Sequence, residues 1–590
     1  MVASCSSFFD EDSSYIIDAD KNHLSNSTDT VYSVIGILNK LQTIADRTVL
    51  LGEARGDLVE ITAATGNDLR QIASFTVDDE NIYNNPEDYY AIINNCNYFI
   101  ANADIEMKDS RNKYIFKSEY AAVKAIRAWT YLQLVTTYGK VPFTVDPILT
   151  NEQAEMPHEM KDIQQVCDYF LHQDNLQEFT YPEVDYPHYS NIKGYPSRLF
   201  YIPMNLILGD LNLWAGNYEE AAKCYYNYIQ KRNGTNSTYY TSVAGTSWMD
   251  NQWNKIQISN IGDFYGKPGN YAQAEMITII PTDSIPSEGA YSSLRSIFNT
   301  DDSNNDYTVE LTPSAALQNL SAAQSYCLYY NDEAVIAPKN LPSHRDGDLR
   351  LCAAWMTYGN AVSSLGDRYE AQYIDKWSNY FTPNVNIYRR TLVYLRLAEA
   401  LNRAGHPEYA FHILSHGINT EVIDGPIAAL VQPEELQYLK TNFDFKGDNA
   451  SGYIVRDDEN KVGGNTQGIH SRGCGYTPLN PNYQMPMRND IVIGVNATDK
   501  ADSIRIQKAY MINAVENLIV DEDALEFAFE GYRYYNLLRV ALRRSALGEG
   551  DTFLQDKLQN RRGEGKDPGI QADLTNKANW FLRWKGQLGY

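Results

Sequence analysis

Two stretches in different halves of the chain repeat one design. Residues 208–221 read LGDLNLWAGNYEEA, and residues 397–410 read LAEALNRAGHPEYA. Each pattern predicts an apolar helix, a reversal at an Ala-Gly pair, and a returning helix that starts with an acidic turn. Glycine permits the reversal, and the small alanines allow two helices to pack closely. The sequence therefore predicts two similar helical hairpins.

Hairpins of this tetratricopeptide type bury their apolar faces only against other hairpins, so the two must meet in space despite long intervening segments. We expect a mostly α fold, a discontinuous tetratricopeptide-type superhelix with an irregular loop-rich subdomain built from insertions. Periodic apolar residues predict helices over residues 30–48, 89–103, 117–138, 160–175, 197–231, 389–416, 503–517 and 521–545.

The expected organisation is a flexible leader over residues 1–20 followed by a single unit over residues 21–590. Its scaffold takes about 89–140, 197–231, 385–416 and 503–545, and the insertions take about 50–88, 233–380 and 420–500. Gly, Asn, Ser, Thr and Tyr crowd the insertions, which predicts loops and short elements. Their aromatic content argues against disorder.

Composition excludes some classes of partner. The formal net charge of −25 argues against nucleic acid and anionic membrane surfaces, which need clustered Lys and Arg. The chain has 45 Tyr against 19 Phe and 8 Trp, and Tyr is favoured at wet recognition surfaces, although ordinary helical cores use it too. The seven Cys form no CxxC pair, so neither a disulfide framework nor a zinc site is predicted.

Known catalytic motifs are missing from the sequence. GxSxG, HExxH, Walker A and GxGxxG do not occur in the context that each requires. Asp78-Asp79 and Asp301-Asp302 are better interpreted as solvated loop faces than as a glycosidase pair. We therefore expect neither an enzyme nor a cofactor, and a binding surface remains.

Aromatic residues in polar loops are the candidates for that surface, because sugar rings stack on aromatic faces while Asp and Asn bind hydroxyl groups. One set lies in the central insertion and a second precedes the helix over 89–103; the predicted ligand-binding residues are Asp57, Tyr83, Asn85, Tyr89, Trp248, Trp253 and Tyr265. The alternative is that each aromatic ring anchors its own loop to the scaffold.

The N-terminus carries small residues directly before Cys5, as at the end of a bacterial lipoprotein signal. The charged start and apolar region of such a signal do not precede them. The residues alone leave lipidation of Cys5 and a chance cysteine equally open.

Four segments resemble the SusD/RagB family. RAWTYLQLVTTYGKVP over residues 127–142 is similar to the family's Arg-Ala…Tyr-Gly-x-Val-Pro stretch, and DGDLRL over 346–351 to its Asp-x-Arg-Leu segment. Residues 390–405 resemble its most characteristic helix, and EFAFEGYR over 526–533 matches its Glu-x-Ala-x-Glu-Gly-x-Arg signature. Asn536 stands where that family more often has Asp.

The resemblance implies a non-catalytic lipoprotein of the bacterial outer membrane, exposed at the cell surface and anchored only through a lipidated Cys5. It implies capture of an oligosaccharide on the irregular face and delivery to a SusC-like TonB-dependent transporter on which the helical repeats dock. No Trp lies between residues 50 and 100, where some members stack a sugar, so peptide capture of the RagB type stays open. Within the signature we predict a buried pair between Glu530 and Arg533.

Overall fold

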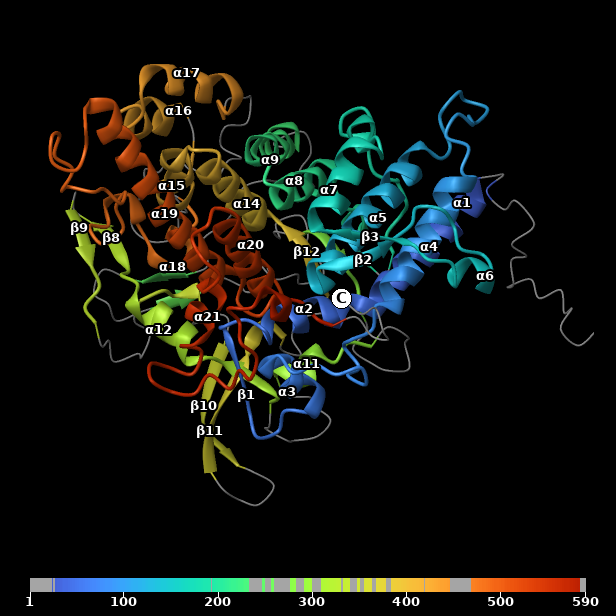
Figure 1. The fold of residues 1–590 in the computed structure, drawn as a ribbon, viewed down its shortest axis with the longest axis horizontal. Coiled ribbons are helices and arrows are strands. Elements are labelled where there is room, and N and C mark those ends of the chain that lie inside the picture. Colours follow the sequence, from blue (N-terminus) through green and yellow to red (C-terminus); the bar gives the residue numbers. More distant parts are fainter. Residues whose placement is uncertain are drawn as a thin grey trace, which may run out of the picture.

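The computed structural model describes residues 24, 27–192, 194–232, 247–249, 256–258, 276–282, 291–299, 309–330, 333–339, 347–350, 355–362, 368–377, 384–418, 420–445 and 468–583. Helices dominate these residues, and the strands are short (Figure 1). The predicted mostly α class is confirmed. No helix in the described ranges combines the length and apolar character that a membrane span needs.

The N-terminal helices are α1 (Ser27–Leu41), η2 (Gln42–Ile44), α2 (Ala45–Glu53), α3 (Asn67–Ser74), α4 (Glu87–Asn102), α5 (Lys117–Tyr138), α6 (Asn151–Ala154), α7 (Ile163–His172), η3 (Leu176–Phe179) and η4 (Ser197–Phe200). Among them, α1, α4, α5 and α7 lie together on one side of the molecule (Figure 1). Helix α5 is buried over most of its length and ends at Gly139, whose φ of 76° stops the helix.

The first predicted hairpin consists of α8 (Met204–Ala215) and α9 (Tyr218–Arg232). Gly216 adopts a φ of +81° at the reversal, a conformation that glycine reaches without strain. Gly209 faces the ring of Tyr225, and a Cβ at this position would lie 2.5 Å from the Tyr225 Cε1 atom. The short sequence LGD thus sets how closely the two helices pack.

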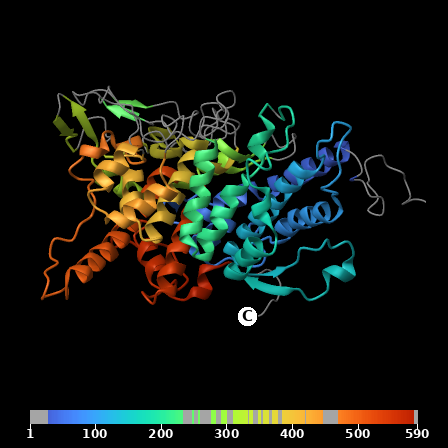
Figure 2. The ribbon, with the colours of Figure 1, turned by 90° about the horizontal axis from the view of Figure 1, so that it is seen from above.

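The second hairpin consists of α14 (Arg390–Arg403) and α15 (Pro407–Ser415), with Gly405 at a φ of +99° and Pro407 in the first turn of α15. Helix α14 packs against α9, so the two hairpins are neighbours in space. Figure 2 shows α8, α9, α14 and α15 side by side across the middle of the molecule.

The C-terminal helices differ from the prediction. A single helix, α19 (Lys500–Phe527), replaces the predicted break near residue 518, and it packs on both α14 and α15. The chain turns only afterwards, at Phe529 (φ 73°) and Gly531 (φ 94°). Helices α20 (Arg533–Ala546), α21 (Phe553–Leu558) and η10 (Lys577–Trp580) follow.

Six two-stranded antiparallel sheets lie in the described parts of the chain. They are β1 (Val59–Ile61) with β7 (Leu311–Pro313), β2 (Lys140–Phe143) with β3 (Glu159–Asp162), β4 (Ser247–Met249) with β5 (Ile256–Ile258), β6 (Met276–Ile280) with β12 (Val385–Arg389), β8 (Cys327–Tyr330) with β9 (Glu333–Ile336), and β10 (Trp355–Val362) with β11 (Arg368–Ile374). Strand β3 occupies the start of the helix predicted over 160–175, because it pairs with β2.

Short helices complete the insertions: α11 (Leu294–Phe298), α12 (Ala315–Ala323), η6 (Asp375–Trp377), α16 (Thr420–Val422), η7 (Ile423–Ile427), α17 (Pro433–Asn442), α18 (Ser471–Cys474) and η9 (Thr477–Leu479). The β8–β9 and β10–β11 hairpins project from the edge of the molecule, on the side away from α1 and α4 (Figure 1). The described residues between 50 and 88 are more regular than predicted, since they include α3 and β1.

Candidate functional site

The residues of the signature segments form a buried network of charges around the turn between α19 and α20. Arg350 binds Asp348, Glu522 and Glu526 at 2.6, 2.9 and 3.2 Å. Arg389 binds Glu526 and Glu530, both at 2.8 Å, and Lys376 also binds Glu530. These carboxylates are each matched by cations inside the core, which is how buried charges are tolerated. The network joins the insertions to the scaffold.

The predicted pair between Glu530 and Arg533 is wrong. Arg533 instead holds Asp57 through two bonds, of 2.6 and 2.8 Å, while Glu530 is taken by Arg389 and Lys376. Burial opposes ionisation of Asp57, but the adjacent Arg533 guanidinium outweighs it and lowers the pKa of that carboxyl. Glu530 and Arg533 are close in sequence, but they lie on opposite sides of a tight turn and their side chains point in different directions. The partner of Arg533, Asp57, lies near the other end of the chain.

Two of the predicted ligand-binding residues belong to the core. Asp57 is buried in its ion pair, and Tyr89 is 1% exposed beneath the guanidinium of Arg47, 5.6 Å from its ring centre. Tyr89 offers no face to a ligand. Asp57 borders a wide depression, but Arg533 holds both of its carboxylate oxygens, so the prediction is corrected for both. Half-buried Tyr83 packs against the main apolar core, and Asn85 uses its amide to bind Asp88. The four residues do not meet in an open cleft.

The remaining predicted residues are not tested by the described structure. Trp248 lies in strand β4, which pairs with β5, but its side chain is outside the described part. Trp253, Tyr265 and Cys5 lie outside the described residues altogether. All four stay predictions.

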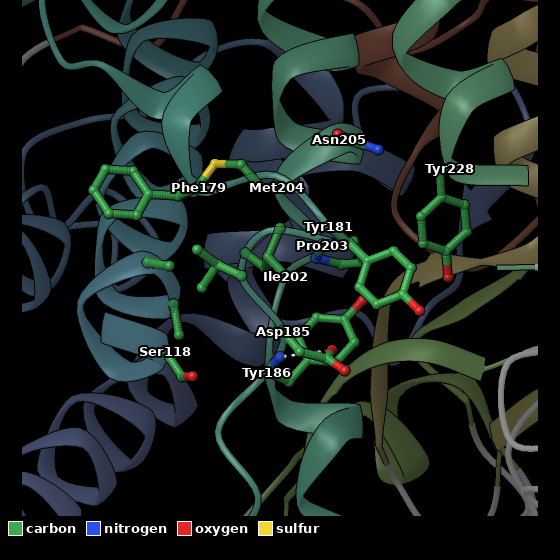
Figure 3. A pocket seen from close by; sticks show the side chains of 13 residues that line it. Ser118, Phe179, Tyr181, Asp185, Tyr186, Ile202, Pro203, Met204, Asn205 and Tyr228 are labelled. Carbon is green, nitrogen blue, oxygen red and sulfur yellow. Dashed lines mark hydrogen bonds between the residues drawn. The ribbon is translucent and has the colours of Figure 1, made fainter. Parts of the chain in front are cut away.

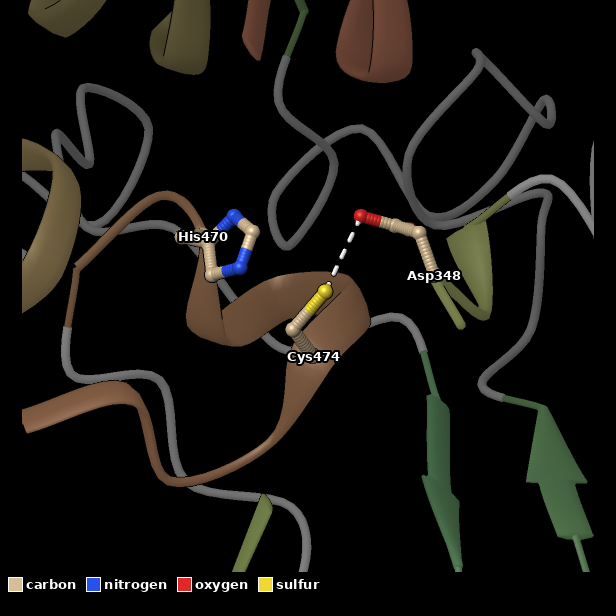
Figure 4. A group of neighbouring side chains, drawn as sticks. All are labelled: Asp348, His470 and Cys474. Atoms are coloured by element: carbon tan, nitrogen blue, oxygen red, sulfur yellow. Dashed lines mark hydrogen bonds between the residues drawn. The ribbon is translucent and has the colours of Figure 1, made fainter. Parts of the chain in front are cut away.

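Asp348, His470 and Cys474 converge near the charged network, with their ligand-type atoms within 4.8 Å of one another (Figure 4). Asp348 is already bound by Arg350, and the Cys474 thiol donates to Asp348 Oδ2 at 3.3 Å. Burial, followed by the neighbouring Asp348 charge, raises the pKa of that thiol well above its usual value. A guanidinium beside the carboxylate repels a metal cation, so this group fits a protonated hydrogen-bonded cluster better than a metal centre.

A cleft lined by aromatic rings lies where α5, α8 and α9 meet the segment over residues 179–186 (Figure 3). We call it the aromatic cleft; its lining is Ser118, Ala121, Ala122, Phe179, Tyr181, Val184, Asp185, Tyr186, Ile202, Pro203, Met204, Asn205 and Tyr228. The free space measures only about 30 Å³, which is room for about two or three water-sized groups. Figure 3 shows the rings of Tyr181 and Tyr186 close together, with Tyr228 across from them.

The chemistry of the aromatic cleft is that of a binding site for a neutral polar molecule. Ile202 and Met204 supply apolar walls, whereas Ser118, Asn205 and Asp185 supply hydrogen-bonding groups. No Lys or Arg is among the described residues that line it. Sequence reasoning missed this cleft because its lining comes from four separate segments; the only local signal was the pair of tyrosines flanking Pro182 and Asp185.

No protein-family model and no curated protein sequence matches the chain. Solved structures match along nearly its whole length. A SusD-like carbohydrate-binding protein from Bacteroides fragilis is 13% identical, with a TM-score of 0.52 over 89% of this chain and 88% of that one. A SusD superfamily protein from Bacteroides thetaiotaomicron is 15% identical (TM-score 0.51; 91% and 94%), and one from Bacteroides vulgatus is 14% identical (0.50; 93% and 95%).

At these identities the likeness concerns the fold, and it covers about nine-tenths of this chain. The protein has the fold of the SusD superfamily.

Proposed function

We propose that this protein is a non-catalytic, SusD-like binding protein that captures an oligosaccharide at the cell surface. The observation that carries the proposal is the shared fold over about nine-tenths of both chains with a protein described as carbohydrate-binding. The aromatic cleft supports it, because tyrosine rings beside Asp, Asn and Ser suit the apolar faces and hydroxyl groups of sugars.

The buried acids support a non-catalytic role. Burial raises the pKa of Glu53 and Asp523 to about 7, a value that would suit a general acid or base. Both carboxyls are buried, however, and neither lines a described cleft. A group that cannot reach substrate cannot transfer a proton to it, so we interpret these pKa shifts as a property of the core.

Binding is tested by calorimetric titration with maltoheptaose, with mixed β-glucan oligosaccharides and with a tryptic peptide pool. We expect heat from a glycan and none from the peptides. Tyr181→Ala in the aromatic cleft and Trp248→Ala or Trp253→Ala in the central insertion should each weaken that binding without unfolding the protein. Tyr114→Ala, at a ring that is 44% exposed elsewhere, is the matched control. Heat from peptides alone would replace glycan capture by the RagB-type alternative.

Delivery to a SusC-like TonB-dependent transporter and anchoring in the outer membrane through lipidated Cys5 are part of the same proposal. They rest on the family resemblance of the signature segments. Metabolic labelling with an alkyne fatty acid should mark the wild type and not Cys5→Ala, and the transporter should co-purify from detergent-solubilised outer membranes. An unlabelled full-length protein in the soluble fraction would overturn the anchor while leaving glycan binding untouched.

A further inference from the structure

A second cleft lies between the first hairpin, the second hairpin and the C-terminal helices. We call it the hairpin cleft; its lining is Thr48, Trp129, Leu132, Gln133, Thr136, Asp210, Trp214, Asn386, Ile387, Tyr388, Arg396, Glu530, Gly531, Tyr532, Tyr535 and Arg539. Its free space is about 50 Å³. Trp214, Tyr535 and Gln133 are half-buried at this cleft, whereas Arg396 and Arg539 are almost fully buried.

Three polar atoms of the lining have no hydrogen-bond partner within the described part of the chain. They are Arg396 Nε, Arg539 Nη1 and Asn386 Oδ1, and each is shielded from bulk water. Buried polar atoms are normally paired, and an unpaired one is costly. Two donors and one acceptor on residues that line a single cleft indicate a ligand that both accepts and donates hydrogen bonds.

The charges around the cleft are already balanced. Arg396 binds Asp210 at 2.8 Å, and Arg539 binds Glu399 with both Nε and Nη2, at 2.8 and 2.6 Å. An anion would find no uncompensated cation here and could not donate to Asn386, and a cation would meet two guanidinium groups. The pattern therefore selects a neutral hydroxyl group.

Size and shape restrict the ligand further. A water-sized group needs roughly 10–15 Å³ of such space, so the cleft accepts about three to five of them. A vicinal diol, with two carbons and two hydroxyls, has this size. The ring of Trp214, stacked under the Arg539 guanidinium at 5.2 Å, offers an apolar wall for the C–H face of a sugar.

We propose that the hairpin cleft binds the vicinal-diol edge of a neutral sugar or polyol, as a site separate from the aromatic cleft. Trp214 and Asn386 contact the ligand, and Arg396 and Arg539 donate to its hydroxyl oxygens. Half-buried Gln133 borders the opening of the cleft and makes no contact on which binding depends. The proposal does not depend on the oligosaccharide proposed for the aromatic cleft, since the two clefts share no residue.

The test is saturation-transfer NMR with glucose and glycerol on the full chain, in parallel with the oligosaccharide titration. Gln133→Trp closes the mouth and should lower the affinity for glucose at least tenfold, whereas Gln133→Ala should leave it within twofold. Asn386→Leu removes the acceptor without breaking any hydrogen bond made by that amide, and it should also lower the affinity tenfold; it serves if Gln133→Trp fails to fold.

Glucose signals equal in wild type, Gln133→Trp and Asn386→Leu would overturn the proposal, even if oligosaccharide binding persists. So would a crystal structure at saturating glucose in which only water fills the cleft. If the wild type binds glucose but no oligosaccharide, and Gln133→Trp weakens the glucose binding, the function proposed for the aromatic cleft is overturned. The proposal for the hairpin cleft is then retained.

Discussion

At the scale of single residues, the protein buries several charged groups close to one another, and each is stabilised by a different kind of contact. Glu53, fully buried, accepts hydrogen bonds from the backbone nitrogens of Phe529 and Gly531 at 3.1 and 2.7 Å. Arg55 lies 4.0 Å above the ring of Tyr534 and has no carboxylate partner among the described residues. Asp57 accepts hydrogen bonds from Nε and Nη2 of Arg533. These three charged residues, which lie within five positions of one another, thus fix the end of α2 against the turn before α20.

The Asp57–Arg533 pair yields a stability prediction. Arg533→Ala leaves a buried carboxylate without its partner and should lower the free energy of unfolding by about 3–5 kcal/mol. A double-mutant cycle in urea unfolding should give strong coupling between Arg533→Ala and Asp57→Ala. The matched cycle with Glu530→Gln should give coupling near zero, because Arg389 and Lys376 hold Glu530. Equal coupling in both cycles would contradict this pairing.

Two buried histidines make stability depend on pH. Burial lowers the pKa of His412 and His416 to about 4, and the neighbouring His412 adds to the effect on His416. The unfolded chain takes up protons near pH 6.5 while the folded imidazoles stay neutral, so both cost stability as pH falls from 6.5 to 4. In His416→Gln the loss of stability across this window should be shallower by up to about 1.4 kcal/mol per pH unit.

The measurement is urea unfolding of wild type and variant at several pH values between 7.5 and 4.5. His188→Gln is the control, because the His188 side chain is 79% exposed. Glu53 and Asp523, with pKa values raised to about 7, act in the opposite direction between about pH 4.5 and 7, but they are common to all three proteins. Parallel curves for wild type and His416→Gln would contradict the prediction.

At the scale of elements, the hairpin geometry depends on a glycine inside a helix. Gly209→Ala should destabilise the protein by about 1–3 kcal/mol, because the new methyl group meets the Tyr225 ring, whose hydroxyl is fixed on Asp210 at 2.5 Å. Gly36→Ala in α1 is the matched control: nothing lies within 4 Å of its added Cβ, so it should stabilise by about 0.5–1 kcal/mol. Thermal unfolding checks both signs, and a neutral Gly209→Ala would show that the ring moves aside.

The elements also show what the sequence could predict. Helix α5 and both hairpins followed from local signals, namely apolar periodicity and glycines at the reversals. The break predicted near residue 518 was wrong, because Leu518 to Asp523 stay helical within α19, which packs on α12, α14, α15 and α20. Asp57 and Tyr89 are buried in contact with Arg533 and Arg47, respectively, and no local sequence pattern identifies these partners.

At the scale of the whole molecule, residues from both ends of the sequence interlock. Asp57 meets Arg533, Thr137 Oγ1 lies 3.0 Å from Tyr535 Oη, and the Leu582 nitrogen donates to the carbonyl of Thr137. Gly52 lies so close to Gly531 that an added Cβ would fall 1.7 Å from the Gly531 carbonyl oxygen. The scaffold is therefore continuous in space although it is divided in sequence.

This interlocking predicts one cooperative unfolding transition. Differential scanning calorimetry should give a single peak whose calorimetric and van't Hoff enthalpies agree, because α2 packs on α20 and the main apolar core joins residues from Leu24 to Leu582. A fragment ending at residue 380 should not show this transition. Two resolved peaks for the full chain would mean that the N-terminal helices fold as an independent unit.

The close contact between Gly52 and Gly531 also sets an order of events for a newly made chain. The contacts of α2 with the turn before α20 cannot form until about nine-tenths of the polypeptide has been made, since Phe529 and Gly531 come so late in the sequence. The surfaces of α2 that contact this turn therefore stay exposed to solvent until the contact forms, and contacts between residues far apart in sequence form slowly. We therefore expect the complete scaffold to form only near the end of synthesis.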